Sequence, residues 1–294
     1  MADLLQNPQY REGKKGAPML AIHSIVHPTD FSDASADAFA HALRIAIMAK
    51  SKLYILHVAM APVDEDWMSF PHVREALARW GFMNADEPTA AIHSKLGVTI
   101  RKVELPPQTP VAGIQAFLDQ HPADLIVLGT EGRHGAARWL HGSVAEKLAR
   151  HARTPTLFVP IHRRGFVDPA RGEVHLRRVL IPVDREPKPA AAFDTIMAFA
   201  HAVGGDVVEE RLLHVGRNPP QVHRHGEPHR AMPVATRQGD VVETIVETAA
   251  DWQADLIGMA TAGHDGFLDA LRGSTTERVL RQAPCSVLAV PVAQ

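Results

Sequence analysis

The chain has 294 residues, a net charge of −2 and one cysteine. This length can hold two domains with separate cores. The near-neutral charge lacks the basic footprint of a nucleic-acid-binding protein, and no apolar run approaches the roughly 20 residues of a membrane span. The single Cys285 excludes an internal disulfide and lies in an apolar run, so we interpret it as a core residue in a reducing compartment. We therefore expect a cytoplasmic protein that binds neither nucleic acid nor membrane.

The first half of the chain alternates strand and helix patterns. Residues 1–17 are polar and predict a flexible tail. Strands are predicted at 21–27, 52–58, 98–103, 125–128 and 156–160. Helices are predicted between them, at 34–50, 73–96, 111–121 and 144–151. This alternation is typical of an α/β fold, in which a parallel sheet carries helices on both faces.

The second half repeats the pattern after a linker, residues 162–175, that is rich in Arg, Gly and Pro and has no apolar period. Its strands are predicted at 178–183, 207–215, 231–236, 256–259 and 287–290. One difference stands out between the second and third strands. The first half has a long insertion there, residues 59–97, with room for a helix. The second half has only residues 216–230, so we expect a loop and no second helix.

Matching segments show that the chain is an internal duplication. Leu56-His57-Val58 corresponds to Leu213-His214-Val215, and each half ends in an apolar run that contains prolines. A repeated unit of this length is one domain, so we predict domains at 18–161 and 176–294. The last runs, 157–160 and 287–291, should be edge strands. Because exposed edges invite pairing, we expect them to meet in antiparallel fashion across a pseudo-two-fold axis.

A glycine-rich loop follows the fourth strand of the first half. Gly129, Gly132, Gly142 and Ser143 are spaced as Gly, two residues, Gly, nine residues, Gly-Ser, and the last pair opens a helical pattern. Glycines let the backbone approach a ligand, and a helix N-terminus offers free N–H groups with partial positive charge. The loop therefore predicts a binding site for an anion, in particular for a phosphate.

These motifs, together with Pro28-Thr29-Asp30-Phe31-Ser32 after the first strand, resemble the universal stress protein family in its tandem, nucleotide-binding form. The resemblance covers nearly the whole chain except the tail and the linker. It implies two doubly wound domains, each a five-stranded parallel sheet of order 3-2-1-4-5. Strand order then reverses between strands one and four, and open parallel sheets bind ligands in the crevice at such a reversal.

The resemblance also implies a site in the first half for ATP with Mg²⁺. The positions that would hold adenine and ribose are Pro28, Thr29, Asp30 and Val58. The positions around the ribose and the phosphates are Gly129, Glu131, Gly132, Gly142, Ser143 and Val144. To these we add Arg133 and Arg138, which are loop cations within reach of phosphate oxygens.

The second half departs from this pattern. Ala260 replaces the first glycine, and Arg185-Glu186-Pro187 stands where the first half has Phe31-Ser32-Asp33. Its loop is also net acidic, with Asp265 and Asp269 against Arg272, and would repel a triphosphate unless a metal intervened. We interpret this half as a weaker second site or a structural partner. The weaker site would use Asp184, Val215, Gly263, Gly273 and Ser274.

Plainer interpretations remain open for several of these residues. Ser143 with Glu146, and Ser274 with Glu277, fit capping boxes, and Asp30 could be a helix N-cap. His57 and His214, at matching positions, suggest satisfied core imidazoles, and Trp67 and Trp80 suggest packing. The histidines at 223, 225 and 229 could bind a metal, but in a chain with 18 histidines a chance cluster is the stronger explanation, so no metal ligand is assigned.

No catalytic motif stands out, so no catalytic residue is assigned and enzymatic activity stays uncertain. We interpret the chain as a nucleotide-dependent sensor or regulator of the stress response, whose bound state is read by an unknown protein partner. The alternative is an interaction scaffold that binds no nucleotide and uses the duplicated fold for dimerisation, and a homodimer is possible. A slow ATPase is the third hypothesis.

Overall fold

The computed structural model describes residues 22–58, 72–130, 154–161, 163–187, 189–224, 229–262 and 275–292. Ten strands lie within these residues. In the first half they are β1 (Ser24–Pro28), β2 (Lys52–Val58), β3 (Thr99–Leu105), β4 (Leu125–Thr130) and β5 (Thr156–Pro160). In the second half they are β6 (Arg178–Pro182), β7 (Glu209–Val215), β8 (Val234–Arg237), β9 (Leu256–Ala262) and β10 (Ser286–Val292).

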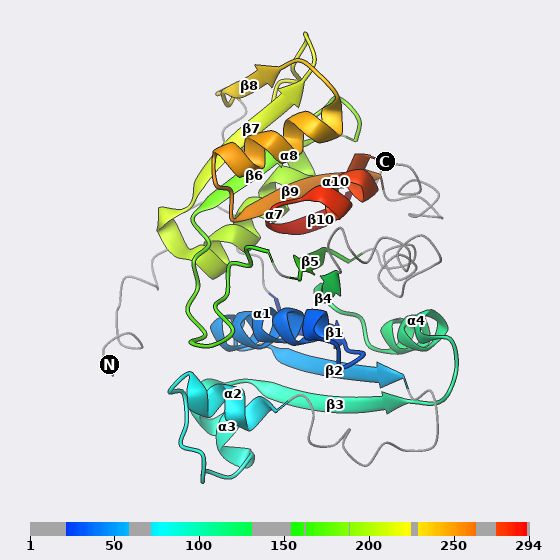
Figure 1. Cartoon of the computed structure of the whole chain (residues 1–294), viewed down its shortest axis with the longest axis vertical. Helices are drawn as coiled ribbons and strands as arrows, with labels where there is room; N and C mark the ends of the chain where they lie inside the picture. Colours follow the sequence, from blue (N-terminus) through cyan, green and yellow to red (C-terminus); the bar gives the residue numbers. More distant parts are fainter. Residues whose placement is uncertain are drawn as a thin grey trace.

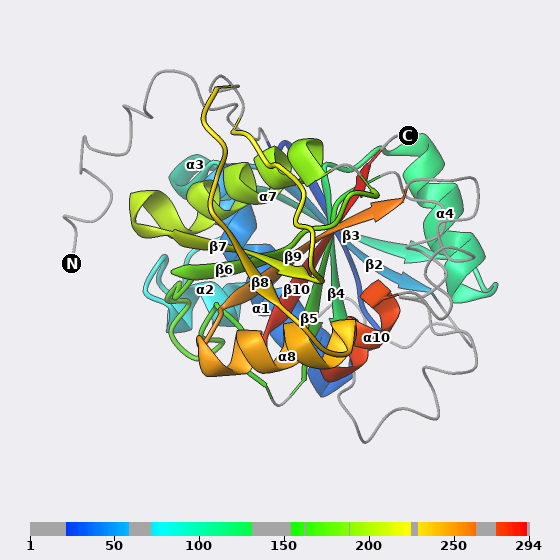
Figure 2. The ribbon, with the colours of Figure 1, turned by 90° about the horizontal axis from the view of Figure 1, so that it is seen from above.

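The described strands form one sheet in the order β3-β2-β1-β4-β5-β10-β9-β6-β7-β8 (Figure 1). In each half the first three strands follow one another toward an outer edge of the sheet, and the fourth strand lies on the other side of the first. The strand order therefore reverses between β1 and β4 in one half and between β6 and β9 in the other. Viewed from above, the strands fan around one another, which is the twist expected of a long parallel sheet (Figure 2). The predicted doubly wound α/β fold is confirmed, whereas the exact domain boundaries stay a prediction.

The two halves are joined by their last strands. Every pairing in the sheet is parallel except that of β5 with β10, where Leu288 faces Leu157 in an antiparallel register. The predicted meeting of the two edge strands is therefore confirmed. Neither strand is left as an exposed edge, and the junction turns two smaller sheets into one.

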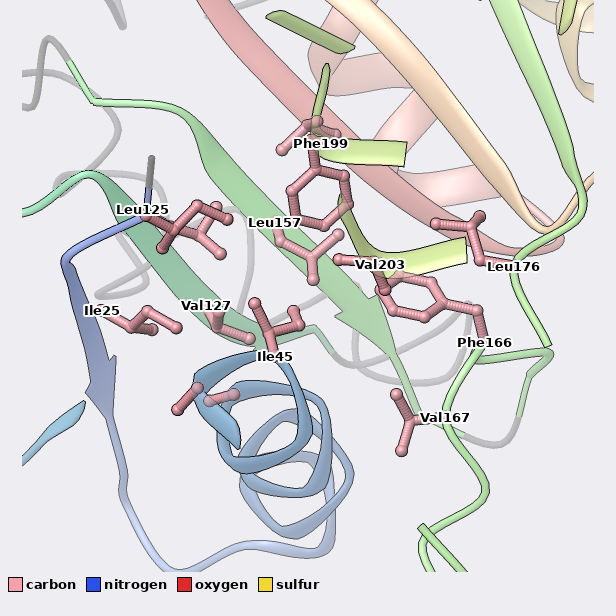
Figure 3. Close-up of a cluster of buried hydrophobic side chains, with 14 of the residues drawn as sticks. Ile25, Ile45, Leu125, Val127, Leu157, Phe166, Val167, Leu176, Phe199 and Val203 are labelled. Atoms are coloured by element: carbon pink, nitrogen blue, oxygen red, sulfur yellow. The ribbon is translucent and has the colours of Figure 1, made fainter. Parts of the chain in front are cut away.

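Helices cover both faces of the sheet. One face carries α1 (Asp33–Ala49), α2 (Val73–Arg79), α3 (Ala90–Leu96) and α7 (Pro189–Gly204), and the other carries α4 (Pro110–Gln120), α8 (Val241–Asp251) and α10 (Thr275–Gln282). Each apolar cluster draws residues from both halves. In the first cluster Leu157 lies between Val127 on one side and Phe199 on the other (Figure 3). The core therefore runs without interruption across the junction.

The helix ends follow local sequence chemistry. Ser32 caps α1 by accepting a hydrogen bond from the Ser35 amide, and Thr109 caps α4 in the same way, with Pro110 at the first helical turn. Asp240 caps α8 and accepts from the amides of Val242 and Glu243. Helix α1 ends at Lys50, which takes a left-handed conformation with φ 52°.

The predicted helix at 73–96 is wrong as a single element, because the structure has two short helices there, α2 and α3. Gly81 has φ +74°, which an α-helix cannot continue, and the chain turns through residues 80–89 before α3 begins. The mostly polar residues 84–89, which include Pro88, mark the break in the sequence, and the prediction of one helix passed over them. In the second half the described residues between β7 and β8 contain no helix, as expected for a loop.

Two strand starts in the second half also differ from the prediction. The strand expected at 207–215 begins only at Glu209, because Gly205–Val207 form a 3-10 turn in which Val207 is exposed. The strand expected at 231–236 is β8, which starts later, at Val234. The predictions began too early because the residues before each strand include apolar side chains that do not take part in strand pairing.

The linker between the halves is part of the fold. Phe166 and Val167 are 1% and 2% exposed and belong to the core cluster that also holds α1 and α7 (Figure 3). Arg163 donates to the carbonyls of Gln282 and Ala283 in the second half, whereas Arg44 and Trp80 of the first half donate to carbonyls of the linker itself. The absence of an apolar period did not prevent burial, since two residues suffice to anchor this segment.

Candidate functional site

The strand order of the first half reverses between β1 and β4, which is where the crevice is predicted. β1 and β4 pair only through Ile25 with Leu125 and Val26 with Ile126, so the strands separate toward their carboxyl ends. At the point of separation the Nδ1 of His27 donates to the Val127 carbonyl at 3.0 Å. An imidazole thus joins the two strands just beyond their last paired residues.

The His27 ring is a neutral group in an apolar setting. It is fully buried, close to Phe39, and burial lowers its pKa from 6.5 to about 4. Its Nε2 has no hydrogen-bond partner among the described residues. Such a ring cannot serve as a general base at the surface of the crevice, so its role is structural.

Asp30 is the most organised polar group at the mouth of this crevice. Its Oδ1 accepts hydrogen bonds from the hydroxyls of Ser32 and Ser35, both at 2.6 Å, and from the Ser32 amide at 3.1 Å. Partial burial acts to raise the pKa of Asp30, but the hydrogen bonds from Ser32 and Ser35 outweigh it and hold the pKa below the ordinary value. The carboxylate is therefore ionised and fixed in orientation.

The alternative interpretation of Asp30 as a helix N-cap is wrong, because the cap of α1 is Ser32. Asp30 lies before the helix and accepts hydrogen bonds from the amide and the hydroxyl of the cap residue Ser32. Its second oxygen, Oδ2, makes no hydrogen bond with any residue that the structure describes. One face of a fixed carboxylate thus remains available to a donor from outside the protein.

The residues on either side of Asp30 form a rigid turn. Phe31 has φ 65°, a left-handed conformation that a bulky residue rarely adopts, and its ring stacks on His57 at a centroid distance of 4.2 Å. The Nδ1 of His57 donates to the Thr29 carbonyl at 3.1 Å, and the Phe31 amide donates to the Thr29 hydroxyl at 3.2 Å. Backbone strain of this kind persists only where surrounding contacts determine it, and it often marks a functional site.

The structure brings together those predicted site residues of the first half that it describes. Pro28 ends β1, Val58 ends β2 beside it, and the Thr29 amide bonds to the Leu56 carbonyl between them. Gly129 lies within β4, paired with Val159, so the strand continues through Thr130 rather than ending at the glycine. The loop residues Glu131, Gly132, Arg133, Arg138, Gly142, Ser143 and Val144 lie outside the described residues.

The matching place in the second half is arranged differently. Asp184 accepts a hydrogen bond from the adjacent Arg185 amide, and its side chain is 70% exposed. Glu186 and Pro189 stand where the first half has Ser32 and Ser35, so no hydroxyl orients this carboxylate. Val215 ends β7 at the corresponding position, and Gly263, Gly273 and Ser274 lie outside the described residues.

Matched histidines keep the same contact in both halves. His57 bonds to the Thr29 carbonyl, and His214 bonds to the Val183 carbonyl at the same distance of 3.1 Å. The prediction of satisfied core imidazoles is confirmed. The packing role of Trp80 is also confirmed, since it is 7% exposed and donates through Nε1 to Pro169, whereas Trp67 lies outside the described residues.

The remaining candidate groups have plain structural environments. Cys285 is buried directly before β10, and burial raises the pKa of its thiol. The interpretation of Cys285 as a core residue is confirmed. The described residues hold no group of three metal-ligating side chains, and His225 of the histidine cluster lies outside them. None of the helices in the described ranges has both the length and the apolar character needed to cross a bilayer.

Sequence reasoning missed three residues of this site. His27 gave no signal, because a lone histidine in an apolar strand is usually a core residue. Ser35 could have been noticed as a hydroxyl close to Asp30 in the first turn of α1. Phe31 belongs to the quoted motif, but its left-handed conformation is not visible in the sequence.

Comparisons with known proteins identify the class. The family model described as the universal stress protein family matches residues 21–160 and 209–291. A curated universal stress protein from Methanocaldococcus jannaschii is 34% identical over 141 residues, which cover 46% of this chain and 80% of that protein. The chain therefore belongs to the universal stress protein family, and its two matched segments make it a tandem member.

Solved structures support the fold. A universal stress protein from Archaeoglobus fulgidus covers 91% of this chain and 98% of its own, with a TM-score of 0.60 and 17% identity. A second solved structure of this kind, from Pseudomonas aeruginosa, covers 93% of this chain and 94% of its own, with a TM-score of 0.61 and 16% identity. At these identities the likeness concerns the fold alone. A universal stress protein in complex with cAMP is 27% identical but has a TM-score of only 0.32, which is too low to transfer its ligand to this chain.

Proposed function

We propose that the first half of this tandem universal stress protein binds ATP, together with Mg²⁺, in the crevice between β1 and β4. The observation that carries the proposal is the Asp30 carboxylate, which two serine hydroxyls hold in place at the crevice mouth. A fixed carboxylate next to a strand end is suited to accept hydrogen bonds from the two ribose hydroxyls of a nucleotide. Its free Oδ2 is the acceptor for that contact.

The rest of the nucleotide fits the residues around Asp30. Val58 and Pro28 would supply apolar walls for the base, since both are buried at the ends of neighbouring strands. The phosphates would lie toward the predicted glycine loop after Thr130, with Arg133 and Arg138 as cations. Mg²⁺ would arrive on the phosphates of ATP, as is usual for this ion, rather than in a cage of protein ligands.

The bound nucleotide would make the protein a sensor or regulator of the stress response, with a protein partner that distinguishes the loaded form from the empty one. A ligand can shift such a partner's binding only through contacts that differ between the two forms. The proposal assigns those contacts to the first half. The second half then acts as a weaker site or as a structural partner, because Asp184 is not held by hydroxyls.

Calorimetric titration with Mg-ATP tests the proposal, with Asp30→Asn and Asp184→Asn as a matched pair. Loss of a hydrogen bond to a charged group is worth about 1.5–3 kcal/mol, so Asp30→Asn should weaken ATP binding by roughly tenfold or more. Asp184→Asn should leave the affinity nearly unchanged. Mass spectrometry of small molecules released from the denatured wild-type protein should detect adenine nucleotide.

The same measurements separate the alternatives. The second candidate function is a scaffold. The pairing of β5 with β10 favours it, because the two halves of the chain already associate with each other as the two copies of a dimer would. A wild-type protein that binds no ATP would support the scaffold. A larger loss of affinity in Asp184→Asn than in Asp30→Asn would refute the assignment to the first half. Phosphate release that disappears with Asp30→Asn would favour the slow ATPase.

A further inference from the structure

The two halves differ by an exchange of side chains at the start of the helix that follows their third strand. In the first half Gln108 precedes the N-cap Thr109, and Gly113 lies in the next turn of α4. In the second half Gly239 precedes the N-cap Asp240, and Thr244 lies in the next turn of α8. A side chain in one position is thus matched by a glycine in the other.

Steric contacts show why the exchange is reciprocal. A Cβ atom on Gly113 would meet Gln108 Nε2 at 3.0 Å and Val58 Cγ2 at 3.3 Å. A Cβ atom on Gly239 would meet the Thr244 hydroxyl at 2.9 Å. The first half therefore has a glycine in the helix where a loop amide approaches, whereas the second half has a threonine in the helix and a glycine in the loop.

The Gln108 amide lies near Val58, one of the residues of the proposed nucleotide site. Val58 pairs with Leu105 at the ends of β2 and β3, and Gln108 is in the loop that follows Leu105. The side chain is exposed, and it makes no hydrogen bond with any residue that the structure describes. Packing against Gly113 and Val58 therefore positions an amide whose donors and acceptor remain free.

We propose that Gln108 reads the edge of the purine base, an inference that rests on the proposed nucleotide site. A carboxamide presents an acceptor and a donor side by side, which matches the 6-amino group and the adjacent ring nitrogen of adenine. That ring nitrogen is N7, and a 6-oxo purine presents two acceptors there, O6 and N7. A carboxamide, whose oxygen and amino group lie side by side, cannot pair with two acceptors in either orientation. In the second half Thr244 is buried and offers only a hydroxyl. The second half therefore has no carboxamide at this place to contact a base.

Calorimetric titrations with Mg-ATP and Mg-ITP test the inference, because the two nucleotides differ at the purine 6-position. The wild-type protein should prefer ATP, and Gln108→Ala should reduce the ATP-to-ITP affinity ratio by about tenfold, within the range for loss of a bidentate base contact. Gly113→Thr, which copies the second half, should displace the amide and reduce the ratio similarly. Gln120→Ala, an exposed glutamine at the far end of α4, is the control and should keep the wild-type ratio.

The outcomes separate this inference from the proposed function. If the wild-type protein binds no ATP, the proposed function fails and the inference fails with it. If the wild-type protein binds ATP and ITP equally, or if Gln108→Ala binds ATP with an unchanged ratio, only the role of Gln108 is refuted. Thermal melting of each variant checks that a change of ratio does not reflect unfolding.

Discussion

The two halves of the molecule share their framework but differ at the crevice. In both, an aspartate holds the start of the first strand by accepting hydrogen bonds from two backbone amides. Asp124 accepts from the amides of His23 and Ser24, and Asp255 accepts from those of Arg177 and Arg178. In contrast, the hydroxyls that hold Asp30 have no equivalent around Asp184. Positions that organise the sheet have the same chemistry in both halves, and positions that would face a ligand do not.

The difference extends into the core. Register places Ile181 where the first half has His27, because both follow the last paired residues of their strands. The same numbering places Thr195 of α7 where α1 has His41. His41 is buried, donates through Nδ1 to the Asp37 carbonyl and accepts at Nε2 from the Val167 amide. The first half thus contains buried histidines at two positions where the second half has other residues.

The largest expected effect tests whether the halves are one cooperative unit. Leu157 and Leu288 face each other across the β5–β10 junction, and both are fully buried. Leu157→Ala or Leu288→Ala should lower the free energy of unfolding by about 3 kcal/mol, as for other buried leucines. Val207→Ala, at a side chain that is 72% exposed, should have little effect. Denaturant titrations that show two separate transitions in the wild-type protein would contradict the single unit.

The second prediction uses pH to distinguish the halves. Burial lowers the pKa of both His27 and His41 to about 4, from 6.5 in the unfolded chain. The folded state therefore favours the neutral rings. Their contribution to the free energy of unfolding is fully present above pH 6.5 and is lost as the pH falls toward 4. Each ring should account for roughly 3 kcal/mol over that interval. The nearby Asp30 charge opposes the loss at His27.

Replacement of the histidine by the residue of the other half measures this contribution. His27→Ile copies Ile181 and should flatten the dependence of the unfolding free energy on pH between 6.5 and 4. Replacement of the surface His72, whose side chain is 49% exposed, by Gln should leave the dependence unchanged. An identical pH profile for His27→Ile and the wild-type protein would show that His27 does not carry the acid sensitivity.

Sequence patterns predicted most of the framework because it depends on local signals. The strands of both halves, the antiparallel meeting of β5 with β10 and the reversal of strand order within each half follow from apolar runs and from the order of repeated elements. The break between α2 and α3 was missed, although Gly81, Pro88 and the polar residues around them mark it in the sequence. The buried linker residue Phe166 was missed because its partners come from distant parts of the chain.

The site was predictable only in outline for the same reason. Asp30 and Val58 could be assigned from the motif and its place at the strand ends. The contact of His27 with Val127 and the exchange of Gln108 and Gly113 depend on tertiary packing between segments far apart in sequence. Such contacts leave no periodic signal, so they become visible only when the strands and helices are placed together.

The smallest expected effect concerns the linker, and it tests whether this segment belongs to the fold of the first half. Gly172 has φ +67°, and a Cβ atom there would lie 2.5 Å from the ring of Trp80. Gly205 of the second half has φ +75° with open space around it. Gly172→Ala should therefore cost about 2 kcal/mol from strain and overlap together, whereas Gly205→Ala should cost about 1 kcal/mol from strain alone. Denaturant titration of both variants measures the difference, and equal destabilisation would mean that the linker yields freely and does not pack rigidly against Trp80.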